Sequence, residues 1–559
     1  MWTSTLSKLA LLLVAQNVVA IPYYYGEKKD DNGAVASEAA VCSEIGVDLM
    51  KRGGNAADAI VGTAICAGTV AMYHSGIGGG GFALIRSPIG VYDFIDFRET
   101  APALSSEDMF ANNTAASIRG GLASATPGEL RGLAEIHTRY GSLPWAELIE
   151  PSIKLARDGF TVTEDLVAYM NHPSGPFPFL TEDPSWAQDF APNGERVKLG
   201  DTMYRKRYAD TLETIADMGV EAFYDGPIAD ATVRKLESTG GIMTLEDLAA
   251  YEIVHRQPVD MNYRGLTLTS CSAPSGGPVV LSTLNVWQGF DEASVDIKAH
   301  RLVESMKFAY GQRSLLGDPS FNGDITTYQE SMFSPAVGDE IRSKIKDDSV
   351  LDPKEYDPAG LESLETPGTS HMVSIDKGGL AISMTSTINL IFGSQVMIPE
   401  TGIIMNNEMN DFSIPGTSNA FGFVPSAANY IRPGKRPLSS MSPSIVENAD
   451  GSINFVIGAA GGSRIITATI QNIIHVIDEG LSAYEAIALP RLHNQLTPNT
   501  TFFEYKYDNT TVAALKGRGQ VPVWVAPGQS TAQGIRRLQN GTFEAASEPR
   551  QKNSGGVAF

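Results

Sequence analysis

The sequence predicts a globular protein of the α+β class, with a helix-rich first part up to Gly368 and a strand-rich second part from Thr369. Hydrophobic residues make up 43% of the 559 residues and charged residues 19%, which is typical of a folded core. Apolar residues recur at helical spacing in the first part, whereas β-branched residues flank a hairpin turn just after Thr369. This length predicts several domains or one large layered domain.

Two helices and a glycine-rich turn are predicted near the start of the chain. Ser37–Lys51 has apolar residues at helical spacing, and Asn55 is a typical cap for a second helix. The glycines of Gly76–Gly81 match GxGxxG, but they follow a helix and precede the strand Phe82–Arg86, which is the wrong order for a dinucleotide site. We therefore expect these glycines to let two backbones approach closely.

A second strand, Val91–Phe97, ends at Arg98 beside this turn. An arginine there is well placed to fork onto a carboxylate, although its spacing alone favours a plain surface ion pair. From Gly120 to Val350 the pattern is mainly helical and predicts scaffold more than chemistry.

The junction before Thr369 is typical of a self-cleaving precursor. Leu351–Gly368 has the composition of a loop, and Met372–Ile375 and Leu380–Ile388 form a predicted hairpin. Cleavage before Thr369 would free an α-amine, with a pKa of about 7.7 to 8.0, beside the hydroxyl that it can deprotonate. Most Gly-Thr junctions before strands are only turns, so the junction alone is weak evidence.

A second glycine pair, Gly461-Gly462, lies between the predicted strand Asn454–Ile457 and the predicted helix Ile465–Ile477. Backbone N–H groups at such a helix start suit an oxyanion. A tight turn without a catalytic role is the alternative.

The N-terminus and the charge indicate where the protein acts. Lys8, the apolar run Leu9–Val14 and the small residues before Ile21 are typical of a signal peptide over residues 1–20, with an uncleaved signal anchor as the alternative. The net charge of −22 argues against nucleic acid or an anionic membrane as partner. Four acceptor sequons for N-glycosylation begin at Asn112, Asn499, Asn509 and Asn540.

The cysteines and histidines do not suggest a metal enzyme. Cys42 and Cys66 can close a bridge between adjacent helices and leave Cys271 free, or all three are buried thiols. No CxxC or HExxH spacing occurs.

Taken together, eight segments in one order resemble the gamma-glutamyltransferase family, also called glutathione hydrolases. They are SEIGVDLMKRGGNAADA, HSGIGGGGFAL, DFRETAP, the Gly-Thr-Ser-His junction, STINLIFGS, NNEMNDFS, KRPLSSMSP and GAAGGSRI. The resemblance implies an N-terminal nucleophile hydrolase with a four-layer αββα sandwich. It also implies a precursor that cuts itself into a large subunit, residues 21–368, and a small subunit, residues 369–559, which remain together as a heterodimer.

The resemblance also assigns roles, residue by residue. It implies that Thr369 is the nucleophile and its α-amine the base, with Thr387 supporting the hydroxyl and Gly461 and Gly462 forming the oxyanion hole. The resemblance further implies that the donor's α-carboxylate is bound by Arg98, Ser439 and Ser440. It implies that the donor's ammonium group is bound by Asn389, Glu408 and Asp411. Relatives often carry a second Asp where this chain has Asn410, which removes a charge beside the amino subsite. Cys42 and Cys66 match a family disulfide, and the loop before Lys435 resembles a lid.

The function implied is hydrolysis of the γ-glutamyl bond of glutathione, its S-conjugates and related compounds, or transfer of the γ-glutamyl group to amino acids or peptides. No cofactor is required. The implied location is the secretory pathway, either extracellular or vacuolar, or a membrane tether if the signal stays. Two alternatives remain open: a cephalosporin acylase or polyglutamate-processing relative, and an uncut, non-catalytic binding protein.

Overall fold

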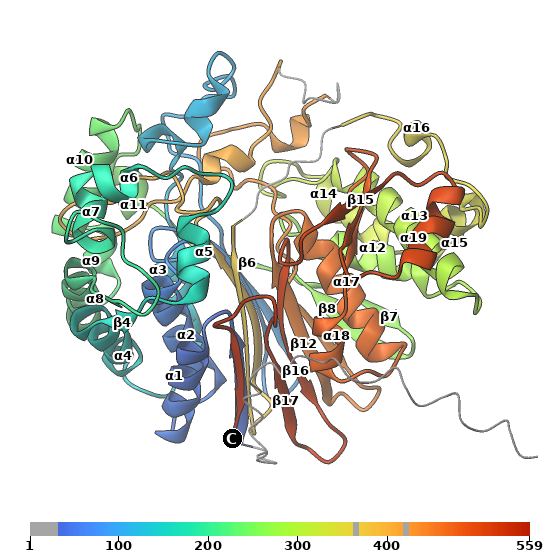
Figure 1. Cartoon of the computed structure of the whole chain (residues 1–559), viewed down its shortest axis with the longest axis horizontal. Helices are drawn as coiled ribbons and strands as arrows, with labels where there is room; N and C mark the ends of the chain where they lie inside the picture. Colours follow the sequence, from blue (N-terminus) through green and yellow to red (C-terminus); the bar gives the residue numbers. More distant parts are fainter. Residues whose placement is uncertain (1–31, 362–367, 417–423) are drawn as a thin grey trace, which may run out of the picture.

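The computed structural model describes residues 32–361, 368–416 and 424–559. Two β-sheets lie face to face at the centre, and each is covered on its outer side by helices (Figure 1). These are the four layers of the predicted αββα sandwich, so the predicted fold is confirmed. The predicted signal peptide, residues 1–20, lies outside the described residues.

The first sheet has seven strands, all paired antiparallel. In spatial order they are β18 (Gly555–Ala558), β1 (Gly33–Ser37), β9 (Ser370–Asp376), β10 (Ala381–Thr387), β2 (Gly80–Arg86), β3 (Tyr92–Phe97) and β6 (Val254–Arg256). Segments from before and after Thr369 are therefore interleaved within one hydrogen-bonded sheet, with β1 between β18 and β9, and β10 beside β2.

The second sheet has six antiparallel strands. They are β17 (Phe543–Ala546), β16 (Thr531–Arg537), β12 (Ile453–Ala460), β11 (Ser444–Glu447), β8 (Leu266–Ser270) and β7 (Val259–Tyr263). The chain from Gly120 to Val350 is mainly helical, as predicted, but it also contains the strands β6, β7 and β8, which the sequence did not predict. Small separate sheets contain β4 (Phe160–Thr161) with β5 (Thr202–Met203), and β13 (Leu492–His493) with β14 (Thr501–Glu504) and β15 (Pro522–Val525).

The helices form the two outer layers (Figure 1). One side has α1 (Ala40–Lys51), α2 (Ala56–Val70), α3 (Glu129–Tyr140), α4 (Trp145–Asp158), α5 (Glu164–Met170), α6 (Phe179–Glu182), α7 (Pro184–Phe190), α8 (Lys206–Met218), α9 (Glu221–Tyr224), α10 (Pro227–Ser238) and α11 (Leu245–Ala249). The other has α12 (Gly277–Trp287), α13 (Val295–Arg313), α14 (Ile325–Met332), α15 (Pro335–Lys344), α16 (Pro353–Tyr356), α17 (Arg464–Ile477), α18 (Ala483–Ala488) and α19 (Asn509–Gly517).

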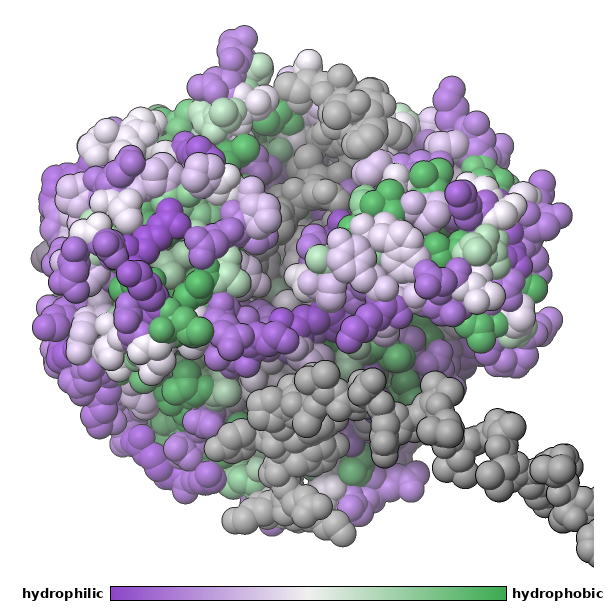
Figure 2. Space-filling model, in the orientation of Figure 1, coloured by the Kyte–Doolittle hydropathy of each residue, from purple (hydrophilic) through white to green (hydrophobic). Residues whose placement is uncertain are grey.

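Strand β2 shows how the layers share the core. Phe82 and Leu84 belong to the hydrophobic cluster that includes the second sheet, whereas Ala83 and Ile85 belong to the cluster under the first helix layer. Because successive side chains of a strand point to opposite faces and β2 is covered on both sides, its residues Phe82–Ile85 are all apolar. The surface seen in Figure 2 is mostly hydrophilic, with hydrophobic side chains in small separate groups.

Most local predictions near the start of the chain are confirmed, with one shifted boundary. Asn55 caps α2 through a capping box with Asp58. Helix α1 begins at Ala40 and not at Ser37, because Gly33–Ser37 forms the strand between β18 and β9. Likewise Pro353–Tyr356 is a short helix within a segment predicted to be a loop.

The glycine-rich turn allows the close approach that the sequence predicted. A Cβ on Gly79 would lie 2.0 Å from the carbonyl oxygen of Thr387, and one on Gly81 would lie 2.0 Å from that of Thr385. Only glycine therefore permits β10 to lie this close to the start of β2.

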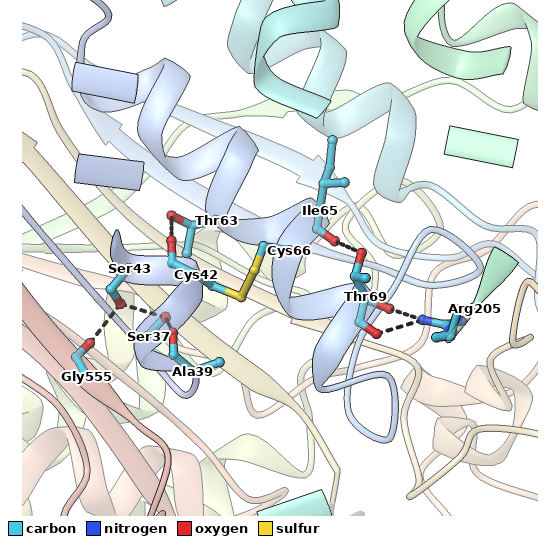
Figure 3. The surroundings of a disulfide bond; sticks show 11 residues. Ser37, Ala39, Cys42, Ser43, Thr63, Ile65, Cys66, Thr69, Arg205 and Gly555 are labelled. Atoms are coloured by element: carbon cyan, nitrogen blue, oxygen red, sulfur yellow. Dashed lines mark hydrogen bonds between the residues drawn. A yellow bond between two sulfur atoms is a disulfide. The ribbon is translucent and has the colours of Figure 1, made fainter. Parts of the chain in front are cut away.

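A disulfide joins Cys42 of α1 to Cys66 of α2, which confirms the predicted bridge (Figure 3). Thr63 donates to the carbonyl of Cys42 at 3.2 Å, and Ser43 donates to the carbonyl of Gly555 at 2.7 Å, so the bridged helices are also tied to β18. Cys271 is buried and unpaired.

The four sequon asparagines, Asn112, Asn499, Asn509 and Asn540, are all exposed, so the fold leaves each one accessible to a glycan. Within the described part of the chain, no helix is long and apolar enough to span a membrane.

Candidate active site

The register of the β9–β10 hairpin brings two threonine hydroxyls together. The ladder ends where Ser370 pairs with Ser386, and continuing this register by one residue places Thr369 opposite Thr387. Their Oγ1 atoms lie 3.4 Å apart, and both side chains are buried. The predicted nucleophile and its predicted supporting hydroxyl are therefore neighbours because of strand pairing.

Both hydroxyls donate hydrogen bonds to the carbonyl oxygen of Gly368, the residue before Thr369. Thr387 Oγ1 donates to the Gly368 carbonyl oxygen at 2.9 Å, and Thr369 Oγ1 donates to the same oxygen. The backbone N–H of Asn389 donates to Thr387 Oγ1 at 2.8 Å, which leaves the proton of Thr387 for the carbonyl. This arrangement polarises the carbonyl beside a hydroxyl that can attack its carbon.

Gly368 itself is required by its conformation. Its φ is +145°, and a Cβ there would lie 2.3 Å from the carbonyl oxygen of Asn389. Other residues are strained in this backbone region and would collide with the following loop.

Arg98 lies at the end of β3 and is 1% exposed, so the surface ion pair that its spacing favoured is wrong. One terminal nitrogen pairs with Asp411 at 2.5 Å and the other with Glu408. Both acids belong to a single 3₁₀ turn, Glu408–Asp411, which folds over the arginine. The structure thus brings the predicted carboxylate-binding residue onto two of the predicted ammonium-binding residues.

Carboxylates outnumber the guanidinium in this cluster. Glu99 is fully buried, with a carboxylate oxygen 3.9 Å from Arg98. Burial raises the pKa of Glu99 to about 7 and raises that of Glu408 well above its usual range. Burial opposes the charge of Arg98, but Glu408 and Asp411 more than offset this and raise its pKa. Burial and the neighbouring carboxylates therefore oppose full ionisation of Glu99 and Glu408 in this cluster.

The amides of the predicted ammonium subsite are held by the same loops. Asn389 has φ +72° and donates from Nδ2 to the carbonyl of Asn407 at 2.9 Å. Asn410 donates to Ser117 Oγ at 2.8 Å, so its side chain joins the first part of the chain to the 3₁₀ turn.

Ser439 and Ser440 are buried in the segment that leads into β11. The Ser439 hydroxyl accepts the backbone N–H of Met441 at 3.1 Å. Arg98 Nε donates to the carbonyl of Pro437 at 3.4 Å, which places this segment beside the arginine. Sequence reasoning missed Arg313, which donates to Ser440 Oγ at 3.0 Å, because nothing in its helical spacing distinguishes it.

The predicted oxyanion turn connects β12 to α17. Gly461 and Gly462 have φ values of +119° and +60°, and a Cβ on Gly461 would lie 2.5 Å from the carbonyl oxygen of Gln529. Tyr310 donates to the carbonyl of Ser463 at 2.5 Å, and Ser463 Oγ donates to Gln495. The turn is thus held by side chains from both parts of the chain.

Residues 42–558 match the family model described as gamma-glutamyltranspeptidase. The chain belongs to this family. It is 52% identical over 540 residues to the glutathione hydrolase proenzyme of Arthroderma benhamiae, covering 94% of this chain and 92% of the relative. It is 49% identical over 542 residues to the glutathione hydrolase of Aspergillus flavus, covering 96% of this chain and 90% of the relative.

The fold of this gamma-glutamyltranspeptidase family member is also similar to the crystal structure of cephalosporin acylase from Bacillus halodurans. The TM-score is 0.83 at 26% identity, covering 98% of this chain and 99% of the acylase. The architecture is that of the N-terminal nucleophile hydrolases. Among the described residues, no group of three or more His, Cys, Asp or Glu side chains is arranged to hold a metal ion.

Proposed function

We propose that this chain is an enzyme that cuts itself before Thr369 and then hydrolyses or transfers the γ-glutamyl group of glutathione and related compounds. The observation that carries the proposal is the pair of hydroxyls on the Gly368 carbonyl, in a chain that belongs to the gamma-glutamyltranspeptidase family. Residues 21–368 are the proposed large subunit and residues 369–559 the proposed small subunit of the resulting heterodimer.

The first reaction is an acyl shift within the precursor. Thr369 Oγ1 attacks the carbonyl carbon of Gly368, while Thr387 donates to the carbonyl oxygen as it becomes negative. The C–N bond then breaks, and the Thr369 nitrogen takes the proton that Oγ1 has lost and becomes a free amine. Water hydrolyses the remaining ester, which leaves a carboxylate on Gly368 and restores the Thr369 hydroxyl.

The donor site recognises the amino acid end of a γ-glutamyl group. Arg98, Ser439 and Ser440 hold the α-carboxylate, while Asn389, Glu408 and Asp411 hold the ammonium. The ion pairs between Arg98 and the two acids support this proposal, because a bound zwitterion can insert between them and give each charge an opposite partner. The distant amide carbonyl is then free to lie at Thr369.

Turnover uses the new terminus. The Thr369 amine accepts the hydroxyl proton, Oγ1 attacks the γ-carbonyl, and the N–H groups of Gly461 and Gly462 stabilise the oxyanion. Each such donor contributes roughly 3 kcal/mol in comparable sites. The amine passes its proton to the leaving group, and water or an acceptor amine then takes the γ-glutamyl group from the acyl enzyme. This sequence of steps uses no cofactor.

An acylase function is the second candidate, because the fold is so similar to that of a cephalosporin acylase. The buried acids Glu408 and Asp411 beside Arg98 favour the γ-glutamyl reaction, since an acyl group without an ammonium leaves them uncompensated. The disulfide and the exposed sequons support an extracellular or vacuolar location reached through a signal over residues 1–20, with an uncleaved anchor as the alternative.

The test is a denaturing gel of the purified protein with N-terminal sequencing of the smaller band, followed by an assay with a chromogenic γ-glutamyl anilide. We expect two bands, a small fragment that begins Thr-Ser-His, and turnover of the anilide. A single uncut chain that binds γ-glutamyl compounds without turnover would support the non-catalytic alternative. Turnover of an acyl anilide that lacks the α-amine, at an equal rate, would support the acylase.

A further inference from the structure

The end of helix α13 brings a second arginine to the proposed donor site. Arg313 is the last residue of α13 and is 6% exposed. Its terminal nitrogen donates to Ser440 Oγ at 3.0 Å. Helix α13 precedes the proposed cut and Ser440 follows it, so this contact joins the two proposed subunits at the site.

We infer that Arg313 is a positioning residue for the donor's α-carboxylate: it orients the Ser440 hydroxyl and supplies positive charge that the carboxylate balances. The inference rests on the proposed function, since it assigns a role within the same donor site.

The direction of the Arg313–Ser440 hydrogen bond determines what Ser440 can do. A guanidinium has donors and no acceptor, so the serine oxygen must accept this bond. Ser440 Oγ makes no other hydrogen bond among the described residues, and its own proton therefore remains to be donated. An acceptor placed against Ser440, such as a carboxylate oxygen, receives that proton.

The guanidinium of Arg313 also has no ion-pair partner among the described residues. Among the described residues no carboxylate lies within ion-pair distance of it, and its buried Nε has no hydrogen-bond partner. Burial lowers the pKa of Arg313, while the negative charge of Asp411 acts in the opposite direction, yet an arginine remains protonated at neutral pH. A buried cation without a partner is costly, so an arriving carboxylate offsets an existing penalty.

Other buried arginines in this protein differ in this respect. Arg98 pairs with Glu408 and Asp411, and Arg491 pairs with Glu548. Arg205 has no carboxylate, but its terminal nitrogens donate to the carbonyls of Gly68, Thr69 and Gly402. Arg313 has neither a carboxylate partner nor a set of backbone carbonyls among the described residues. It contacts the Ser440 hydroxyl, which belongs to the proposed carboxylate subsite.

The remainder of the helix end makes Arg313 a rigid support. Tyr310, one turn earlier, donates to the carbonyl of Ser463 in the oxyanion turn at 2.5 Å. The same turn of α13 therefore contacts both the turn proposed to stabilise the oxyanion and the serine proposed to bind the carboxylate.

The experiment replaces Arg313 in the full-length protein and compares two competitive inhibitors. L-glutamate carries the α-carboxylate, and 4-aminobutanoate is the same molecule without it. For R313M we expect intact self-cleavage on a gel, a KM for the γ-glutamyl anilide raised about 10-fold, and a kcat changed less than about threefold. The inhibition constant for L-glutamate should rise by a similar factor while that for 4-aminobutanoate stays the same. R313K should recover part of the loss, because it keeps the charge but not the fork.

A double-mutant cycle with S440A isolates the contact. If Arg313 acts partly through Ser440, the double variant binds L-glutamate more tightly than the product of the two single effects predicts. R301Q is the matched control, because Arg301 lies on the same helix, roughly 18 Å from Arg313 by helical rise, and pairs with the partly exposed Asp347. It should leave every constant unchanged.

Equal weakening of both inhibitors in R313M, or a fall in kcat with KM unchanged, would overturn the inference and leave the proposed function standing. Unaltered constants would also overturn it. A wild-type protein that is uncut and does not turn over the γ-glutamyl anilide would refute the proposed function, and with it this role for Arg313.

Discussion

The two ends of the proposed active site are built in different ways. At the nucleophile end, Thr369 and Thr387 are adjacent because two consecutive strands pair in one register. At the recognition end, Arg98 and the turn Glu408–Asp411 come from segments more than three hundred residues apart, and Arg313 comes from a third. In the proposed mechanism, local strand pairing therefore determines where the attack occurs, and long-range packing determines which substrate groups are bound.

The same contrast appears in the chemistry. The nucleophile end contains hydroxyls and backbone groups, whose orientation is set by hydrogen bonds to one carbonyl. The recognition end is a buried charge cluster, in which Glu99, Glu408 and Asp411 share one guanidinium. Changes at the first end should alter self-cleavage and kcat, whereas changes at the second should alter KM.

Replacing the nucleophile should have the largest effect. We expect T369A to remain a single chain and to lose about 10⁴-fold or more in activity, because Thr369 supplies both the attacking hydroxyl and the proposed α-amine base. T369S, which keeps a hydroxyl, is the control and should still be cleaved. Gel analysis and the anilide assay measure both. Two fragments from T369A would contradict the assignment.

The supporting hydroxyl comes next. T387V keeps the shape of the side chain but removes the donor to the Gly368 carbonyl, and we expect self-cleavage to slow by about 10²- to 10³-fold. The rate is measured from the loss of precursor on a gel after expression of the uncut form. T387S should be cleaved at a near wild-type rate. Normal cleavage of T387V would mean that the hydrogen bond from Thr387 to the Gly368 carbonyl has no role in the reaction.

At the recognition end, R98K should raise the KM for the γ-glutamyl anilide by about 10- to 100-fold with a smaller change in kcat. A lysine keeps the charge but cannot contact Glu408, Asp411 and a substrate carboxylate with a planar fork. Steady-state kinetics measure the effect, and R139K at the partly exposed Arg139 is the control. Unchanged kinetics would remove Arg98 from the site.

The smallest expected effect concerns the buried acid Glu99. Its folded pKa of about 7 lies above the ordinary value of 4.5, so it contributes stability below pH 4.5 that is lost as pH rises through 7. E99Q cannot ionise, so its Tm relative to wild type should rise by about 1–3 °C between pH 4.5 and pH 8. Thermal unfolding at several pH values measures this, and a difference that does not depend on pH would show that Glu99 does not titrate in this range.

The sequence was sufficient for the parts of the molecule that local pattern determines. The hairpin after Thr369, the Asn55 cap and the strand-to-helix turn at Gly461 all follow from neighbouring residues. The interior position of Arg98 was not predicted, because the turn that covers it lies far away in the chain.

Arg313 and the strands β6 to β8 were missed for a related reason. Short strands inside a mainly helical stretch give little period-two signal, and β6 has only three residues. The family resemblance provided the layered architecture and the site assignments, but Arg313 matched no quoted motif. Its relevance depends on the Ser440 contact, which only tertiary structure reveals.

The interleaving of strands in the first sheet has a consequence for maturation. Strand β1, from the N-terminal side of the junction, lies hydrogen-bonded between β18 and β9, which both follow it. The proposed cut before Thr369 would therefore release a chain end while these strand pairings still hold the two fragments together. In the proposed maturation the polypeptide would complete its tertiary structure before scission, because halves made separately would each lack partners for their exposed strand edges.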